Sequence, residues 1–227
     1  MASRDIIVYD FETTGKNPNT CQPTQLAALA LDGRNFRLKG TFNSEIKPLY
    51  FDEEEAVENG WGAIEQGALD ITGKTLAELQ KAPTLDSVWP KFVKFVNKYN
   101  WKGTPWFAPI PCGYNINNYD SIIIKKLCKM YGPWDEKYST QALFHPIQKF
   151  DVMDDMFGWT ESDPTIKSIS MDNVRKRMGM SDEGAHDALQ DVKDTANILI
   201  KFQKTKREIY KKLKIDDCFA NGGLYIE

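Results

Sequence analysis

The spacing of apolar residues predicts strands in the first part of the chain. Residues 4–9 form a nearly continuous apolar run, which is typical of a central buried strand. Residues 24–31 are a second strand candidate, although their alanines and leucines suit a helix equally well. A turn signal at 32–35 precedes residues 36–46, whose alternation predicts a third strand. Together these segments predict an antiparallel meander.

Helical spacing follows further along the chain. Residues 50–82 mix acids, glycines and short apolar groups, which indicates small helices and loops. Residues 84–99 form an amphipathic helix pattern. Residues 118–131 predict another helix, which Gly132 and Pro133 end.

The last part of the chain predicts three further helices. Residues 133–165 are irregular apart from a candidate short helix at 151–157. Ser170 can cap a helix that ends at Gly179, and a long final helix is expected at about 187–213. The expected buried stripe of the final helix consists of Leu189, Val192, Ala196, Leu199 and Phe202.

Residues 106–114 predict a fourth strand that contains two prolines. Because Pro109 and Pro111 cannot donate ladder hydrogen bonds, we expect this strand to be short or edge-like.

Length and composition fit one α/β domain. A chain of 227 residues can bury a full core, and its 41% hydrophobic and 27% charged residues are ordinary for a soluble globular protein. No apolar stretch approaches the roughly 20 residues of a membrane span. Without repeats or a long linker, we predict a single domain over 1–227, with a motif-bearing core at about 5–205 and a basic C-terminal helix and tail at about 201–227.

The net charge of −3 disfavours a general nucleic-acid coat protein, but not an enzyme that grips a few nucleotides with its own cations. The basic run at 201–214 is expected to be a solvated helix face, with phosphate contact as the alternative. No CxxC spacing or signal-peptide pattern is present, so we expect reduced thiols in a cytoplasmic protein. The four cysteines are Cys21, Cys112, Cys128 and Cys218.

Three short acidic clusters carry the candidate chemistry, and the first is Asp-Phe-Glu-Thr-Thr-Gly at 10–15. Strand alternation places Asp10 and Glu12 on one face and Phe11 on the other. Two such carboxylates repel each other unless a cation lies between them, and oxygen-only ligands favour Mg²⁺ or Mn²⁺ over zinc. Alone, a pattern this short is more often an exposed strand end.

The second cluster, Gly-Tyr-Asn-Ile-Asn-Asn-Tyr-Asp at 113–120, ends in the first turn of a predicted helix. A favourable charge at a helix N-terminus is the simpler explanation for Asp120, with Asn115 and Asn118 as turn or cap residues.

The third cluster, His-Asp-Ala-Leu-Gln-Asp at 186–191, is more specific. On one regular helix His186 and Asp191 would lie about 140° apart. They converge only if His186 sits on the loop before the helix and bends over, which Gly179 and Gly184 make feasible. His145 has no acidic neighbours, and we interpret it as an ordinary residue.

These groups together indicate metal-dependent phosphodiester hydrolysis. Two divalent ions about 4 Å apart, held by carboxylates, can activate water and stabilise a leaving oxygen. A histidine that titrates near neutral pH can take the proton from that water.

The motifs D-x-E-T-T-G, G-Y-N-x-x-x-Y-D and A-H-D-A-x-x-D, in this order, resemble those of the DnaQ-like 3′→5′ exonucleases of the DEDDh subgroup. Within it, the chain is most similar to exonuclease domains of the exonuclease I type, over about residues 5–205. Asn115 lies five residues before Asp120, as in that type, whereas the DnaQ proofreading pattern has asparagine at the position of Ile116. The resemblance implies a ribonuclease H-like fold, with a five-stranded mixed sheet of order 3-2-1-4-5 flanked by helices.

The resemblance also implies roles for the acidic residues and the histidine. Asp10 would bridge two Mg²⁺ or Mn²⁺ ions, and Glu12 and Asp191 would hold the ion that carries the attacking water. Asp120 would hold the other ion, and His186 would be the general base.

Substrate contacts follow from the same resemblance. Backbone atoms around Thr13 and Thr14 would meet the terminal 3′-hydroxyl, and Phe11 or a nearby apolar group would stack on the last base. Asn115 is a further expected substrate-binding residue. The implied substrate is single-stranded DNA or the 3′ ends of duplex DNA, as in proofreading, with nucleoside 5′-monophosphates as products. An RNA-directed exonuclease and a metal-free nucleic-acid-binding module stay open as alternatives, and the sequence identifies no protein partner.

Overall fold

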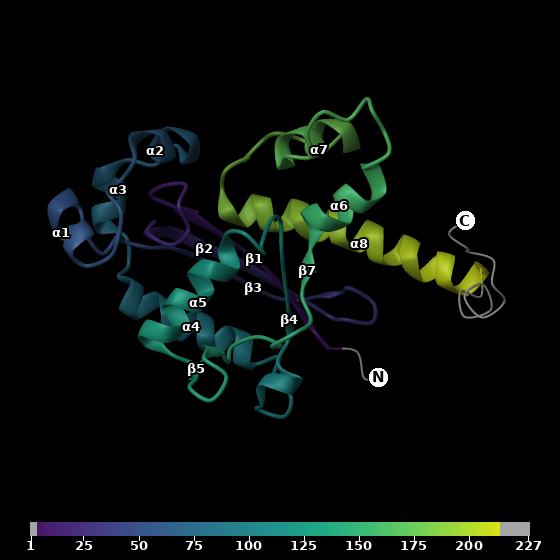
Figure 1. The fold of residues 1–227 in the computed structure, drawn as a ribbon, viewed down its shortest axis with the longest axis horizontal. Helices are drawn as coiled ribbons and strands as arrows, with labels where there is room; N and C mark the ends of the chain where they lie inside the picture. The colour runs from purple at the N-terminus through teal and green to yellow at the C-terminus, as the bar shows by residue number, and fades with distance from the viewer. Residues whose placement is uncertain (1–3, 214–227) are drawn as a thin grey trace, which may run out of the picture.

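A five-stranded mixed sheet with helices on both faces organises the molecule (Figure 1). The structure is a computed structural model, and it describes residues 4–213. The strands of the sheet are β1 (Ile6–Thr13), β2 (Pro23–Leu31), β3 (Leu38–Glu45), β4 (Ile110–Gly113) and β7 (Phe150–Asp151). Their order is β3-β2-β1-β4-β7, with antiparallel pairing from β3 to β1 and parallel pairing from β1 to β7.

This is the ribonuclease H-like sheet order that the motifs imply. The fifth strand carries the label β7 because β5 (Trp134–Asp135) and β6 (Thr140–Gln141) form a separate hairpin inside the segment predicted to be irregular. The helices are α1 (Glu53–Glu58), α2 (Gln66–Thr72), α3 (Leu76–Lys81), α4 (Leu85–Asn97), the short 3₁₀ helix η1 (Pro105–Phe107), α5 (Asp120–Tyr131), α6 (Val152–Thr160), α7 (Met171–Met178) and α8 (Ala188–Leu213). The predicted helices are all present, with ends that differ by a few residues.

Alternation along β1 builds two cores. Ile7, Tyr9 and Phe11 face the layer of α4 and α5, whereas Ile6 and Val8 face the layer of α6, α7 and α8. Figure 1 shows α8 crossing one face of the sheet, and α8 contacts both β1 and β2. Each fully buried large apolar side chain contributes about 1.5–3 kcal/mol. The same alternation turns the carboxylates at the end of β1 toward α8.

Pairing with neighbouring strands decides the conformation of the alanine-rich strand β2. All nine residues of β2 are buried between the two helical layers, and β2 pairs with strands on both sides. Pairing and burial therefore override the helical propensity of its alanines and leucines.

The strand β4 is short, as predicted, but it lies inside the sheet rather than at an edge. The N–H of Ile110 donates to the carbonyl of Asp5 on the β1 side (2.9 Å). Because successive residues point to opposite sides, Pro111 faces β7, whose pairing begins only at Cys112. The proline therefore removes no ladder bond.

The remaining histidine and the cysteines have structural surroundings. Nδ1 of His145 accepts hydrogen bonds from the N–H groups of Ile147 (3.2 Å) and Gln148 (2.8 Å), which fits the ordinary role predicted for it. Three cysteines are buried and free, and Cys218 lies outside the described residues. None of the helices described between residues 4 and 213 has the length and apolar character to cross a bilayer. A cytoplasmic location stays a prediction.

The carboxylate of Asp151, at the end of β7, holds the loop that follows β4. It accepts hydrogen bonds from the N–H groups of Asn115, Asn117 and Met153, each at 3.0 Å. The side chain therefore caps α6 and shapes the turn that leads into α5 at the same time. Through that turn it places Asp120.

We predict that Asp151→Ala lowers the free energy of unfolding by about 2–4 kcal/mol, because it leaves three N–H groups without their charged acceptor. Urea denaturation of the purified variant measures this. Asp86→Ala is the matched control, since Asp86 is exposed in the first turn of α4 and its loss should cost less than about 1 kcal/mol. Equal stability of the two variants would contradict the role given to Asp151.

Candidate active site

Carboxylates from three separate segments meet at the end of β1. Ligand oxygens of Asp10, Glu12 and Asp191 lie within 4.8 Å of one another. Asp191 is in the first turn of α8, which packs on β1. Asp120 is the first residue of α5, and its Oδ1 accepts a hydrogen bond from the N–H of Phe11 (3.1 Å). The structure thus brings three of the four predicted metal ligands together and places Asp120 next to them, close enough to raise the pKa of Asp10.

Burial and mutual repulsion raise the pKa values of these carboxylates. Burial is the main cause for Asp10, whose pKa lies well above its usual range, with Asp120 and Glu12 adding to it. Burial also raises the pKa of Glu12 to about 8, with Asp191 as a second cause, and that of Asp120 to about 7. Such a group of oxygen ligands can be ionised together near neutral pH only with a cation beside it. The residues present therefore fit a divalent ion of the Mg²⁺ type.

His186 lies on the loop before α8, as the spacing predicts. Its backbone is left-handed (φ 65°), as are those of Gly184 (φ 76°) and Gly179 (φ 65°). The N–H of His186 donates to Oδ1 of Asp191 (3.3 Å), so the loop bends back over the first turn of α8. The structure places His186 beside the carboxylates.

A buried polar network anchors this loop. Oδ1 of Asp187 accepts from the N–H groups of Leu189 (3.1 Å) and Gln190 (3.2 Å) at the start of α8. Oδ2 of Asp187 accepts from Nε2 of Gln25 (3.0 Å), which lies opposite Glu12 in the sheet. Nζ of Lys74 donates to Oε1 of Gln25 (3.0 Å). Sequence reasoning missed this network, because Gln25 and Lys74 belong to no motif.

Arg175 is a second missed residue, and it comes from α7. Its side chain is fully buried, and Nη2 lies 2.6 Å from Oδ1 of Asp191. Nε lies 2.8 Å from Oδ2 of Asp194, and Nη1 lies 3.4 Å from Oδ1 of Asp172. In the sequence it is one of three consecutive basic residues on an amphipathic helix, so only its position beside Val174 on the buried face could have marked it.

Comparison with known proteins gives the family. Residues 7–199 match the family model described as Exonuclease. The chain belongs to the exonuclease family. DNA polymerase III subunit epsilon of Aquifex aeolicus is 26% identical over 214 residues, which cover 94% of this chain and 86% of that protein. Exodeoxyribonuclease I of Escherichia coli is 24% identical over 215 residues, covering 88% of this chain and 40% of that one. The PolC-type DNA polymerase III of Thermotoga maritima is 23% identical, and the match spans 12% of its length.

Solved structures share the fold of this exonuclease-family domain. E. coli exonuclease I in complex with a dT13 oligonucleotide superposes with a TM-score of 0.68 at 21% identity, covering 92% of this chain and 43% of that one. Cell-death related nuclease 4 gives a TM-score of 0.64 at 19% identity, covering 89% and 64%. The chain therefore spans less than half of exonuclease I.

Phe11 and Thr14, two of the residues expected to contact the substrate, are buried. The ring of Phe11 is 4% exposed and packs edge-on against Tyr9, so the expectation that it stacks on a base is wrong. Thr14 is fully buried, and its N–H, carbonyl and hydroxyl are all hydrogen bonded to Gln22 or Glu65. It holds the loop and leaves no atom for a substrate.

The alternative to Phe11 is a nearby apolar side chain, and one such side chain lines an open cavity beside Glu12 and Thr13. Its volume is about 220 Å³. Ile71, on α2, lines it and is 51% exposed. The hydroxyl of Thr13 hydrogen bonds to that of Tyr119 (2.6 Å) at the same cavity. No pattern in the sequence points to Ile71, because the short helices of 50–82 carry no motif.

Asn115 lies on the loop between β4 and α5 in a left-handed conformation (φ 59°). Its Oδ1 accepts from Nδ2 of Asn118 (2.9 Å). Its contact with a substrate stays a prediction.

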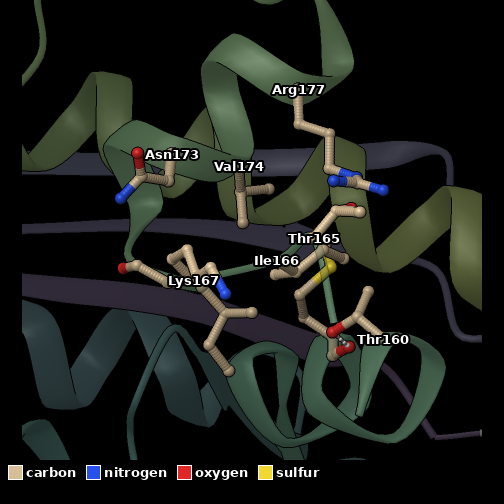
Figure 2. Close-up of a pocket in the computed structure, with 10 residues that line it drawn as sticks. Thr160, Thr165, Ile166, Lys167, Asn173, Val174 and Arg177 are labelled. Atoms are coloured by element: carbon tan, nitrogen blue, oxygen red, sulfur yellow. Dashed lines mark hydrogen bonds between the residues drawn. The ribbon is translucent and has the colours of Figure 1, made fainter. Parts of the chain in front are cut away.

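A separate cavity of about 290 Å³ lies between α6, the segment after it and α7 (Figure 2). Figure 2 shows that Lys167, Asn173 and Arg177 belong to its lining, and none of the four clustered carboxylates does. Arg177 is paired with Asp163 (3.3 Å). The candidate active site is therefore the carboxylate cluster at the end of β1.

The raised pKa values predict how pH acts on the protein without metal. Folded Glu12 and Asp120 keep protons that the unfolded chain loses above about pH 5, so stability should fall between about pH 5 and pH 8. Thermal unfolding in EDTA measures this fall, and Mg²⁺ should raise the midpoint more at pH 8 than at pH 5. Glu12→Gln should flatten the dependence, whereas the exposed control Glu54→Gln should follow the parent. A parent midpoint that rises from pH 5 to pH 8 in EDTA would contradict these pKa directions.

Proposed function

We propose that this protein removes nucleotides from the 3′ end of single-stranded DNA, with Mg²⁺ or Mn²⁺, and releases nucleoside 5′-monophosphates. The observation that carries the proposal is the convergence of Asp10, Glu12, Asp120 and Asp191, beside the loop that bears His186. Membership of the exonuclease family supports the reaction class. DNA as substrate is supported by the likeness to exonuclease I bound to oligonucleotides and to polymerase subunits.

The four carboxylates would hold two divalent ions, with Asp10 shared between them. Bound there, the ions would supply an activated water and stabilise the leaving oxygen. Asp10 and Glu12 are placed for this by the rigid pairing of β1 with β2, and Asp120 by its bond to the N–H of Phe11. The protein thus fixes the ligand positions before any substrate arrives, which is what electrostatic preorganisation requires.

His186 would take the proton from the attacking water. Histidine is the side chain that most often serves as a general base, and the anchored Asp187 next to His186 limits the movement of the loop. The left-handed backbone at His186 turns the chain between the polar loop and α8. A general base on such a loop can reach the site without being part of the helix.

The terminal nucleotide would occupy the cavity beside Glu12 and Thr13. Its apolar wall, Ala68 and Ile71, suits the face of a base, and the backbone around Thr13 lies next to the carboxylates for a 3′-hydroxyl. Thr14 would act by shaping this loop. Asn115 would contact the substrate from the loop between β4 and α5.

The first test is Asp10→Asn, which should lower the rate of mononucleotide release about a thousandfold or more while the fold is kept. End-labelled single-stranded DNA, duplex DNA and RNA are incubated with the protein and Mg²⁺, and the ladders show direction and preference. The exposed Asp154→Asn is the matched control and should retain parent activity.

Several outcomes would contradict the proposal. An Asp10→Asn variant as active as the parent would refute the site. A parent protein that digests RNA in preference to DNA would refute the substrate. A parent that binds oligonucleotides but digests none would indicate a binding module.

The second test is His186→Ala, which should lower kcat by about a hundredfold to ten-thousandfold because the proton acceptor is lost. Mn²⁺ binding without substrate should stay close to that of the parent, since the imidazole is not one of the proposed ligands. Single-turnover kinetics with saturating Mn²⁺ measures the first quantity and calorimetric titration the second. Loss of Mn²⁺ binding with the chemistry intact at high Mn²⁺ would make His186 a ligand and not a base.

A further inference from the structure

The guanidinium of Arg175 has surroundings unlike those of its neighbours on α7. Lys176 and Arg177 are exposed, whereas Arg175 is fully buried. Taking a cation out of water costs several kcal/mol unless anions and hydrogen bonds compensate it. The compensation comes from Asp191 and Asp194 on α8 at 2.6 and 2.8 Å, and from Asp172 on α7 at 3.4 Å. The site of the buried charge is therefore built by two helices together.

The planar guanidinium of Arg175 forms a fork that bridges the carboxylates of Asp191 and Asp194. Nη2 lies 2.6 Å from Oδ1 of Asp191, and Nε lies 2.8 Å from Oδ2 of Asp194. The two acids are three residues apart and so share one face of α8. The other oxygen of Asp194 accepts from Nε2 of Gln190 (3.0 Å), and Asp194 is 4% exposed. Asp194 is thus a fixed anchor on one side of the fork.

The bonds to Asp191 fix the rotation of its carboxylate. Oδ1 of Asp191 receives both Nη2 of Arg175 and the N–H of His186 (3.3 Å). Two donors on the same oxygen hold that oxygen on the α7 side. One oxygen of this carboxylate lies within 4.8 Å of ligand oxygens of Asp10 and Glu12, so the bonds that fix its rotation also orient it toward the cluster.

We propose that Arg175 is a positioning residue that sets the orientation of Asp191 as a metal ligand. The inference rests on the proposed function only in treating Asp191 as a ligand. Two effects of Arg175 oppose each other: its charge repels a divalent ion, whereas its fork holds the ligand in place. In this proposal the fork dominates, so loss of its planar shape weakens metal binding even when the positive charge is kept.

The test compares Arg175→Lys with the parent by titrating the full chain with Mn²⁺ in the absence of DNA. Lysine keeps the charge but offers a point donor in place of the fork. The Mn²⁺ dissociation constant should rise about tenfold, and the Mn²⁺ concentration for half-maximal DNA hydrolysis should rise in parallel. The value of kcat at saturating Mn²⁺ should fall less than threefold. Arg177→Lys, the same change at an exposed position of α7, is the matched control and should bind Mn²⁺ like the parent.

Folding is checked by far-UV circular dichroism and thermal unfolding in EDTA. If Arg175→Lys does not fold, Asp194→Asn takes its place, because it loosens the anchored side of the fork without touching Asp191. A folded Arg175→Lys, or in its place Asp194→Asn, that binds Mn²⁺ as tightly as the parent or more tightly overturns the proposal, and tighter binding would show that charge dominates. A parent that binds no Mn²⁺ overturns it as well. A parent that binds Mn²⁺ but digests no DNA refutes the proposed function, and the comparison of Mn²⁺ binding still decides the role of Arg175.

Discussion

Mutual repulsion among buried carboxylates is the constraint on which the rest of this structure depends. Burial disfavours ionisation of Asp10, Glu12 and Asp120, and neighbouring acids of the cluster add to the effect at Asp10 and Glu12. A folded chain keeps such an arrangement only if the backbone around it is held elsewhere. The two cores on either side of β1 supply that stability, since its apolar residues are buried on both faces.

Two further carboxylates, those of Asp151 and Asp187, accept hydrogen bonds that help to place the candidate ligands. Asp151 shapes the turn before Asp120, and Asp187 caps the helix that carries Asp191. Each of these carboxylates accepts N–H groups at a helix start, so each is satisfied without a cation. Asp10 and Glu12 differ from them, because the charged groups around these two residues are chiefly other acids.

The motif residues could be predicted from their local spacing, and the strand order from the resemblance of the motifs to those of a known family. Asp10 and Glu12 share a face through strand alternation, and His186 had to leave the helix to approach Asp191. Predictions failed where a distant partner decides the outcome. Phe11 is buried because α4 and α5 cover that face of the sheet. β4 lies inside the sheet because its Pro111 meets the side where β7 has not yet begun. The positions of Lys74 and Arg175 beside the acids depend on how separate helices pack, which no spacing along the chain reports.

The ion pair between α7 and Asp191 has a consequence beyond the carboxylates themselves. Because α7 carries none of the three motifs, the Arg175 contact connects a peripheral helix to the carboxylate cluster. Thermodynamic linkage is reciprocal. If the packing of α7 against α8 strengthens cation binding, then cation binding stabilises that packing by the same free energy. Amide hydrogens of α7 should therefore exchange with solvent more slowly when a divalent cation is bound to the carboxylates, although α7 carries none of the proposed ligands.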